Sequence, residues 1–414
     1  MAERLQGAGI GGWGLRSLLW AGVLAGCLSF GWAILSGDLP RAWQAYLVNL
    51  VFWLGVCTGS VTLVAIMNMT NASWGRPLKR LAEAGVAPLP VLWMMLLGLY
   101  LGHQEIYPWA REVPHGKGLW LSAGFLFPRD ALVLGALVAV AVAMVYNSVK
   151  ADRDAMEGSE QGVQTRWRAQ VTLSPVLGIL YGIGMTILAW DLVMSLDPHW
   201  VSTLFGAYYF MGSLYTGIAW VSLLAAFLHG REEFQGLVGA SQFHDLGKLI
   251  LAFCLVTGDF FYSQFLVIWY GNIPEETKYV ILRVRTSPWN ALAWSVLVAS
   301  FGIPFLALLS RKLKKNPRML GALACLVLLG MWLERVLLVA PSVWHGRELP
   351  LGGAELGIAI GFLGLVGLLV RWFLFRVPWL PMGDPLYQKC WQPGIVQEAP
   401  AGQRLSSQPG GGHG

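Results

Sequence analysis

The sequence carries little charge for its length. Only 13% of its 414 residues are Asp, Glu, Lys or Arg, whereas 56% are hydrophobic and the mean hydropathy is +0.56. A soluble domain carries about twice that share of charged residues, at roughly 25%. The low charge therefore excludes an ordinary soluble domain and predicts a protein that lies in a membrane.

Motifs that bind metals, haem or phosphate are also missing. The cysteines occur singly, so the chain has no C-x-x-C zinc motif and no C-x-x-C-H haem-attachment motif. They are predicted to be packing residues: Cys27, Cys57, Cys254, Cys325 and Cys390. The histidines fall at the ends of apolar runs or between them, and the sequence has no P-loop, G-x-S-x-G or H-E-x-x-H motif. We therefore expect the chain to bind no redox metal itself and to carry no hydrolytic site.

Long apolar runs dominate the sequence. A helix needs about 20 mostly apolar residues to cross the hydrocarbon core, and ten runs meet this requirement. They begin near Gly14, Trp43, Ala87, Ala131, Leu173, Leu204, Leu246, Ala291, Leu320 and Leu356. We predict an all-α polytopic membrane protein whose transmembrane domain, residues 14–376, lies between a tail at 1–13 and a tail at 377–414. The second tail is rich in Gly, Pro, Ser and Gln from about residue 392, a composition that favours disorder.

The distribution of basic residues predicts the orientation. Of the 29 Lys and Arg residues, 18 lie in the two tails and in the connections on the same side as the tails. The opposite connections hold 8, and 3 lie inside apolar runs. Because basic residues remain preferentially in the cytoplasm, both termini are predicted to be cytoplasmic. The net charge of +6 then needs no nucleic-acid partner.

The seventh run carries polar residues at helical spacing. His244, Lys248, Asp259 and Ser263 share one face of a helix at 100° per residue, and Tyr262 flanks that face. Ionisable residues at membrane depth are costly and are functional candidates by default. We predict a proton path along this ladder, with Asp259 near its centre. The alternative is structural: Lys248 extends to the membrane surface and Asp259 pairs with another helix.

Charged residues also lie near the predicted outer surface. Asp191 comes shortly before the end of the fifth run, and Glu334 and Arg335 lie at a similar depth in the ninth. The three side chains are compatible with a proton exit. An ion pair between Asp191 and Arg335 that joins two helices is an equally good interpretation.

The heptapeptide MSLDPHW, residues 194–200, ends the fifth run at the predicted outer surface. Asp197 and His199 are interpreted as a docking surface for extrinsic subunits or as a point of proton release, because histidine titrates near neutral pH. Trp200 is assigned to the same docking or exit surface and also fits the belt of aromatic residues at a membrane interface. A solvated helix cap is the simpler alternative for the polar pair.

Three runs contain G-x-x-x-G pairs, which let helices approach closely. The pairs are Gly55 with Gly59, Gly178 with Gly182, and Gly357 with Gly361. They predict a tightly packed bundle and carry no information about a substrate.

Three blocks of the sequence carry a resemblance to a known family. They are DLVMSLDPHWVSTLFGAYYFMGS at 191–213, HDLGKLILAF at 244–253 and SQFLVIWYGNIPEETKY at 263–279. In this order and spacing they resemble the ActF family, membrane subunits of alternative complex III, which is a bacterial quinol:cytochrome c or electron-acceptor oxidoreductase. The family is part of the NrfD and polysulfide-reductase superfamily. The hydropathy pattern extends the likeness over most of residues 14–376.

The resemblance implies two four-helix bundles with two peripheral helices, in a metal-free subunit of the bacterial inner membrane that supports its partners and conducts protons. The implied partners are an ActC-like paralogue, an iron–sulfur subunit, multihaem and monohaem cytochrome c subunits, small membrane subunits and lipids, so that haem c and iron–sulfur clusters belong to the partners. A quinone such as menaquinone is the one cofactor that the resemblance allows this subunit itself to bind. Matching polar positions are Asp191, Asp197, His199, His244, Asp245, Lys248, Glu275 and Glu276, and the last two join the expected docking or exit surface. Asp259 and Tyr262 lie between matching blocks.

Two other functions are compatible with the sequence. A quinone-binding NrfD-like subunit of another respiratory complex requires a cavity near the outer surface, lined by aromatic residues and a His or Asp. A stand-alone ion-coupled secondary transporter also uses acids inside the membrane, although such proteins favour interrupted helices at repeated positions. A transporter should work without partner subunits.

Overall fold

The computed structural model describes residues 13–112, 116–231, 238–344, 346 and 348–387, and no strand occurs among them. Ten helical segments in this part of the chain are long and apolar enough to cross a membrane, and each contains one of the predicted runs. The predicted all-α polytopic membrane fold is confirmed. Residues 1–12 and 388–414, which include Cys390 and the stretch predicted to be disordered, lie outside the described residues.

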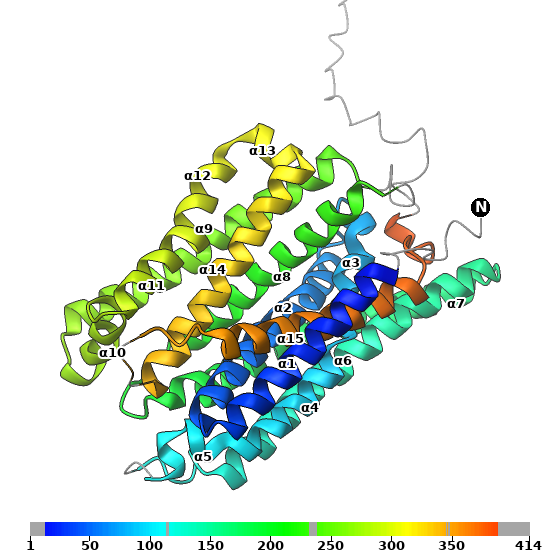
Figure 1. Ribbon diagram of the computed structural model, residues 1–414. Helices are drawn as coiled ribbons and strands as arrows, with labels where there is room; N and C mark the ends of the chain where they lie inside the picture. The colour runs from blue at the N-terminus through cyan, green and yellow to red at the C-terminus, as the bar shows by residue number, and fades with distance from the viewer. Residues whose placement is uncertain (1–12, 113–115, 232–237, 345, 347, 388–414) are drawn as a thin grey trace, which may run out of the picture.

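The ten spans are formed by long helices with short helical turns between or within them (Figure 1). The main helices are α1 (Trp13–Leu35), α2 (Leu39–Met69), α4 (Leu89–Leu99), α6 (Ala123–Met156), α7 (Glu160–Leu188), α8 (Phe205–His229), α9 (Ala240–Gly271), α11 (Trp289–Leu297), α12 (Ile303–Leu309), α14 (Pro317–Val343) and α15 (Gly353–Arg376). The third span starts at η2 (Arg76–Leu78), α3 (Lys79–Glu83) and η3 (Ala84–Val86), and ends at η4 (Tyr100–Gly102) and α5 (His103–Ile106). Outside the spans lie η5 (Pro108–Ala110), α10 (Pro274–Val284) and α13 (Arg311–Lys315).

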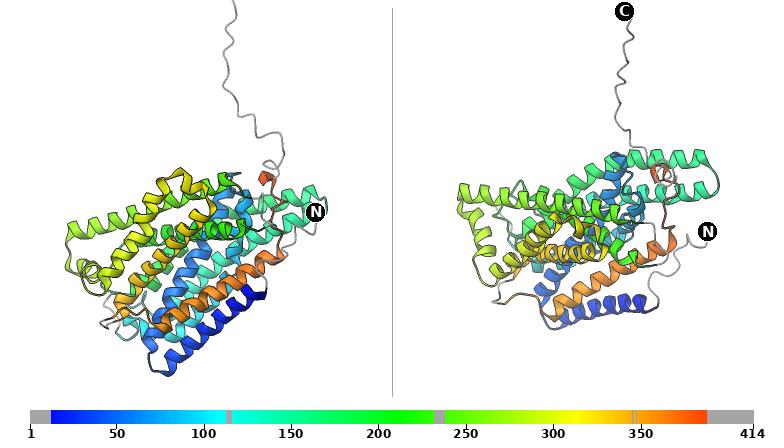
Figure 2. Two further views of the ribbon diagram at one scale, coloured as in Figure 1. Left: turned by 45° about the horizontal axis from the view of Figure 1, so that its top comes forward. Right: turned by 90° about the horizontal axis from the view of Figure 1, so that it is seen from above.

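The helices form two four-helix bundles that meet at the centre of the molecule. In the first bundle α2, α4, α6 and α7 contact one another in a ring, and in the second α8, α9, the α11–α12 span and α14 do the same. Contacts of α2 with α8 and α14 join the bundles. Helices α1 and α15 pack together against α2 on one flank, while α9 and α12 lie on the other (Figure 2). This is the arrangement that the family resemblance implied.

Glycines allow the closest helix contacts. A methyl group on Gly59 would overlap the carbonyl oxygen of Ser213 in α8, and one on Gly361 would lie 2.6 Å from the Cα of Gly26. Close packing is therefore confirmed for the glycine pairs of α2 and α15. The prediction of close packing is wrong for the glycine pair of α7, because no atom lies within 4 Å of the position that a methyl group on Gly182 would occupy.

The described cysteines divide into two groups. Cys57 and Cys254 are buried between helices, as predicted for packing residues. Cys27 and Cys325 are exposed, so the packing prediction is wrong for these two. The sequence could not separate the groups, because apolar residues lie on both the buried and the exposed faces of these helices.

Candidate functional site

Two buried aspartates lie near each other in the first bundle, at the end where α6 begins and α7 finishes. Asp191 lies in η6 (Ala189–Val193), a π-helical turn that follows α7, and Asp130 lies near the start of α6. Neither side chain is exposed. π-Turns are rare and occur often at functional sites. Here the turn carries an acid that the sequence had already indicated as a candidate.

Arg129 holds the Asp191 carboxylate in place. Its Nε and Nη2 atoms donate to Asp191 Oδ2 over 2.9 and 2.6 Å, and Trp120 Nε1 donates to Oδ1 over 2.9 Å. The guanidinium stacks on the Trp120 ring, with 3.8 Å between Cζ and the ring centroid. The ion-pair partner of Asp191 is therefore Arg129, and the proposed pair with Arg335 is wrong.

Asp130 lies near Asp191. The charge of Asp191 acts on the Asp130 carboxyl group, and neither oxygen of Asp130 accepts from a nitrogen or hydroxyl donor. Two neighbouring carboxylates repel each other at low dielectric. The pair is therefore a candidate site for holding a proton.

Helix η7 (Met194–Leu196) and its surroundings close this end of the bundle. Ser195 Oγ donates to the carbonyl of Asp191 over 2.5 Å and accepts from Trp109 Nε1 over 3.2 Å. Lys117 Nζ donates to the carbonyl of Pro198 over 2.6 Å. The MSLDPHW segment is thus fixed to the connection that precedes α6, close to the aspartate pair.

Trp200 is part of the core and is not available for docking. It is 1% exposed and stacks on Tyr279 of α10, with 3.7 Å between ring centroids. Arg283 covers the other face of Tyr279, with Cζ 3.4 Å from the centroid. The prediction that Trp200 belongs to a docking surface is wrong, because α10 folds back over it.

Arg283 also supplies a hydrogen-bond donor that the backbone of α14 lacks. Pro341 has no N–H, so the carbonyl of Leu337 lacks its helical donor, and Arg283 Nε donates to that oxygen over 3.1 Å. Arg283 Nη2 donates to Leu338 O and Ser342 Oγ, both over 2.9 Å.

The remaining docking candidates stay predictions: His199 and Glu275 are exposed, while Asp197 and Glu276 are half-buried.

A second buried acid lies in the second bundle. Glu334 Oε1 accepts from the Tyr208 hydroxyl over 2.6 Å, and Arg335 Nη1 lies 2.9 Å from Glu334 Oε2. The Arg335 guanidinium stands 4.2 Å from the centroid of Tyr209. Glu334 and Asp191 therefore have different cationic partners, and the three residues predicted to line one exit belong to two clusters.

The ladder of the seventh run lies on an outward face of α9. Lys248 and Asp259 are exposed, Tyr262 is 59% exposed, and Ser263 and His244 are half-buried. Lys248 Nζ pairs with Asp245 over 2.9 Å. The shared helical face is confirmed, but within this chain the face does not run through the interior of a bundle.

Part of the ladder borders a cavity of about 620 Å³ in the second bundle. Asp259 and Tyr262 line it from α9, Tyr208 and Glu334 from α8 and α14, and Arg283 from α10. Aromatic and aliphatic side chains form the rest of the wall. The structure thus brings Asp259 and Tyr262 of the seventh run together with Glu334 of the ninth.

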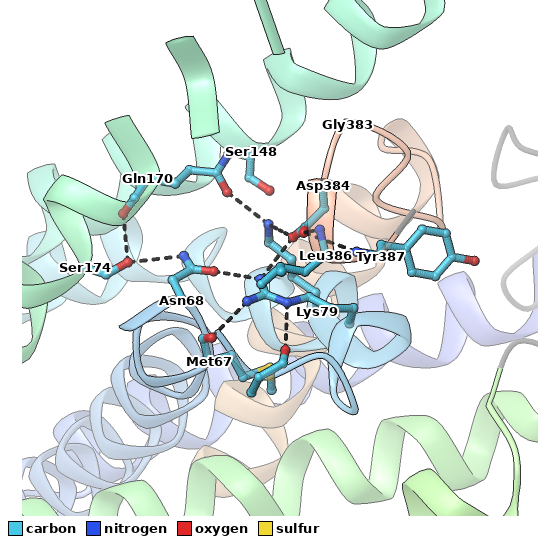
Figure 3. A network of polar contacts seen from close by, with 12 residues as sticks. Met67, Asn68, Lys79, Ser148, Gln170, Ser174, Gly383, Asp384, Leu386 and Tyr387 are labelled. Atoms are coloured by element: carbon cyan, nitrogen blue, oxygen red, sulfur yellow. Dashed lines mark hydrogen bonds and ion pairs between the residues drawn. The ribbon is translucent and has the colours of Figure 1, made fainter. Parts of the chain in front are cut away.

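A third polar cluster lies at the opposite end of the first bundle, and Figure 3 shows the part of it around Lys79 and Asp384. Its cations come from the start of the third span and its acids from three separate elements. The charged members are Arg76, Lys79, Arg80, Glu83, Asp152 and Asp384, each at most 2% exposed. Arg80 pairs with both Glu83 and Asp152. From the sequence, the three basic residues had been assigned to a connection between spans, and their burial was missed.

No group of three or more His, Cys, Asp and Glu residues suited to a metal ion occurs in the part of the chain that the structure describes. A scan against protein-family models finds no match to this chain, and a comparison with curated proteins finds none either. The likeness to the ActF family therefore stays a prediction that rests on the three sequence blocks.

Proposed function

We propose that this chain is a metal-free membrane subunit of a quinol-oxidising complex of the alternative complex III type, in which it conducts protons and supports its partners. The proposed location is the bacterial inner membrane, with both termini in the cytoplasm. An ActC-like paralogue, an iron–sulfur subunit and c-type cytochrome subunits are the proposed partners. The observation that carries the proton role is the burial of Asp130, whose oxygens lack a hydrogen-bond donor, near Asp191, which is held by Arg129.

The geometry supports a simple proton step. Arg129 donates two hydrogen bonds to Asp191, whereas Asp130 has no such donor, so Asp130 is the proposed proton carrier. A proton that reached Asp191 would leave Arg129 without its counter-charge, which favours release of a proton from the pair. The MSLDPHW segment lies next to the pair, and His199 is an exposed acceptor there.

Isolation of the complex is the first test. The tagged full-length chain is purified from its native membrane in mild detergent, its partners are identified by mass spectrometry, and a reduced-minus-oxidised spectrum is recorded. Co-purified iron–sulfur and c-type haem subunits support the proposal. A haem-free chain that purifies alone overturns it and favours the transporter.

The proton role is tested in vesicles that contain the purified complex. Asp130→Asn and Asp191→Asn are expected to lower the number of protons released per electron by at least half, whereas Glu157→Gln, an exposed control, leaves it unchanged. Asp259→Asn tests the α9 ladder in the same assay. An unchanged ratio in Asp130→Asn would refute the paired-carboxyl mechanism.

Quinone binding is a second candidate function, and the cavity beside α9 favours it. Ligand sites are mostly apolar cavities of about 300–1,000 Å³ with a few polar groups, and this one has Glu334, Tyr208 and Asp259 in its wall. Quinone extracted from the purified protein should fall below half in Val296→Trp, which fills the cavity. An unchanged quinone content would exclude this cavity as the site.

A further inference from the structure

Residues 379–387, here named the C-terminal strap, are anchored in a buried cationic socket. Asp384 Oδ2 accepts from Arg76 Nη1 over 2.9 Å and from Lys79 Nζ over 2.7 Å. Its Oδ1 accepts from the backbone N–H groups of Leu386 and Tyr387 over 3.0 and 3.4 Å. Both carboxylate oxygens are therefore fully used (Figure 3).

The socket also stabilises its cations through an aromatic ring. The ring of Trp167 in α7 lies 5.3 Å from Arg76 Cζ and 5.7 Å from Lys79 Nζ. Burial alone would raise the pKa of Asp384, but Lys79 and Arg76 outweigh it and lower the pKa below its usual value. Asp384 is thus ionised at neutral pH, and the network holds three cations against three carboxylates.

A second anchor fixes the strap to α6. The N–H of Gly383 donates to Asp152 Oδ1 over 2.9 Å. A methyl group on Gly383 would overlap the backbone carbonyl of Ala151, so the strap lies directly on the α6 backbone at this point. Trp379 and Tyr387, at the two ends of the strap, are 6% and 4% exposed.

Polar groups continue from the socket into the first bundle. Arg76 Nη1 donates to Asn68 Oδ1 over 2.8 Å, and Asn68 Nδ2 donates to Ser174 Oγ over 3.1 Å. Lys79 Nζ donates to Gln170 Oε1 over 2.9 Å. Ser174 is fully buried and its hydroxyl group contacts Met144, where the surrounding side chains become apolar. Water that entered beside the socket would therefore find a polar column that points into the bundle holding Asp130 and Asp191.

We propose that the C-terminal strap is a removable seal over this end of the first bundle and that Asp384 is the residue that holds it closed. Release of Asp384 leaves Arg76 without a carboxylate and leaves Lys79 with Glu83 alone, 3.9 Å away. Buried cations that lose a carboxylate partner draw in water. Hydration would then extend along Asn68 to Ser174. Control of proton uptake by the seal depends on the proposed function. Control of water access by the seal does not depend on it.

Thiol accessibility tests the seal directly. Cys27, Cys325 and Cys390 are replaced by Ser, and Ser174→Cys supplies a buried reporter. A membrane-impermeant methanethiosulfonate reagent is applied to inside-out and right-side-out vesicles. Reporter modification is expected to be at least tenfold faster when Asp384→Asn is added, and unchanged when the exposed control Glu157→Gln is added.

A second variant guards against misfolding of the first. Gly383→Ala keeps every charge but displaces the strap from Ala151, so it should also speed up reporter modification. Correct folding of each variant is checked by size-exclusion chromatography in detergent. Equal modification rates in the parent, Asp384→Asn and Gly383→Ala would overturn the proposal, as would rapid modification in the parent.

The outcomes separate the seal from the proposed function. Acceleration from either face supports the seal, and the face that responds identifies the orientation. Proton leak is measured in the same vesicles. Faster modification of the reporter thiol without a proton leak would support the seal and contradict a proton path in the first bundle.

Discussion

The contact between α2 and α8 gives a sharp test of how the two bundles are joined. In Gly59→Ala, the new methyl group would lie 2.9 Å from the carbonyl carbon of Ser213 and 3.0 Å from Leu214 Cα, and it would overlap the Ser213 oxygen. These atoms are backbone, which cannot move without a shift of the whole helix. Overpacking of this kind costs about 1–3 kcal/mol.

The same substitution has the opposite effect where space is open. Alanine stabilises a helix interior by about 0.5–1 kcal/mol relative to glycine, and Gly182 has no atom within 4 Å of the added methyl group. Gly182→Ala is therefore a matched control. We expect a lower thermal midpoint for Gly59→Ala and an equal or higher one for Gly182→Ala.

Thermal unfolding in detergent, followed by loss of the monodisperse size-exclusion peak, measures both variants. A midpoint for Gly59→Ala at or above that of the parent would refute the close contact of α2 with α8. An equal fall in both variants would show that glycine flexibility, and not packing, determines the result.

Three further predictions concern buried charge. Arg80→Met leaves Asp152 without its cation and Glu83 with Lys79 alone, and should cost about 3–5 kcal/mol of stability, whereas Arg153→Met at an exposed position should be neutral in the same unfolding assay. Arg283→Leu should increase hydrogen exchange in residues 274–284 at least tenfold, and Lys278→Leu should not; equal exchange in both would contradict the stacking role. Because its pKa is lowered, Asp384 contributes stability above its unfolded value of about 3.9, and the contribution is lost as pH falls through the lower folded value. The difference in thermal midpoint between the parent and Asp384→Asn should thus be large at pH 7 and shrink below about pH 4, and an equal difference at both pH values would refute the assignment.

The spans could be predicted from the sequence because each depends on a continuous local run of apolar residues. The side chains with which the polar residues interact could not be predicted from the sequence. Arg129 and Asp130 stand next to each other at the start of the fourth span, and an adjacent base and acid at such a position is a usable signal. From the sequence, Arg129 had been assigned to a connection, because charge alone does not show where a helix begins.

Trp200 shows a different limit of the sequence. An aromatic residue at a membrane edge fits the interfacial belt and the core equally well, and only the return of α10 over it decides between them. Asp259 is similar, since helical spacing predicted the face it shares with Lys248 but not whether that face points inward. Long-range packing determines both outcomes.

The anchor of the strap also sets an order of events during synthesis. Asp384 follows Arg76 by 308 residues, and translation at about 5–20 residues per second separates them by roughly 15–60 s. Throughout that interval the newly inserted helices hold two cations without their shared carboxylate. A chain that stopped short of Asp384 would keep Arg76 and Lys79 without their shared carboxylate.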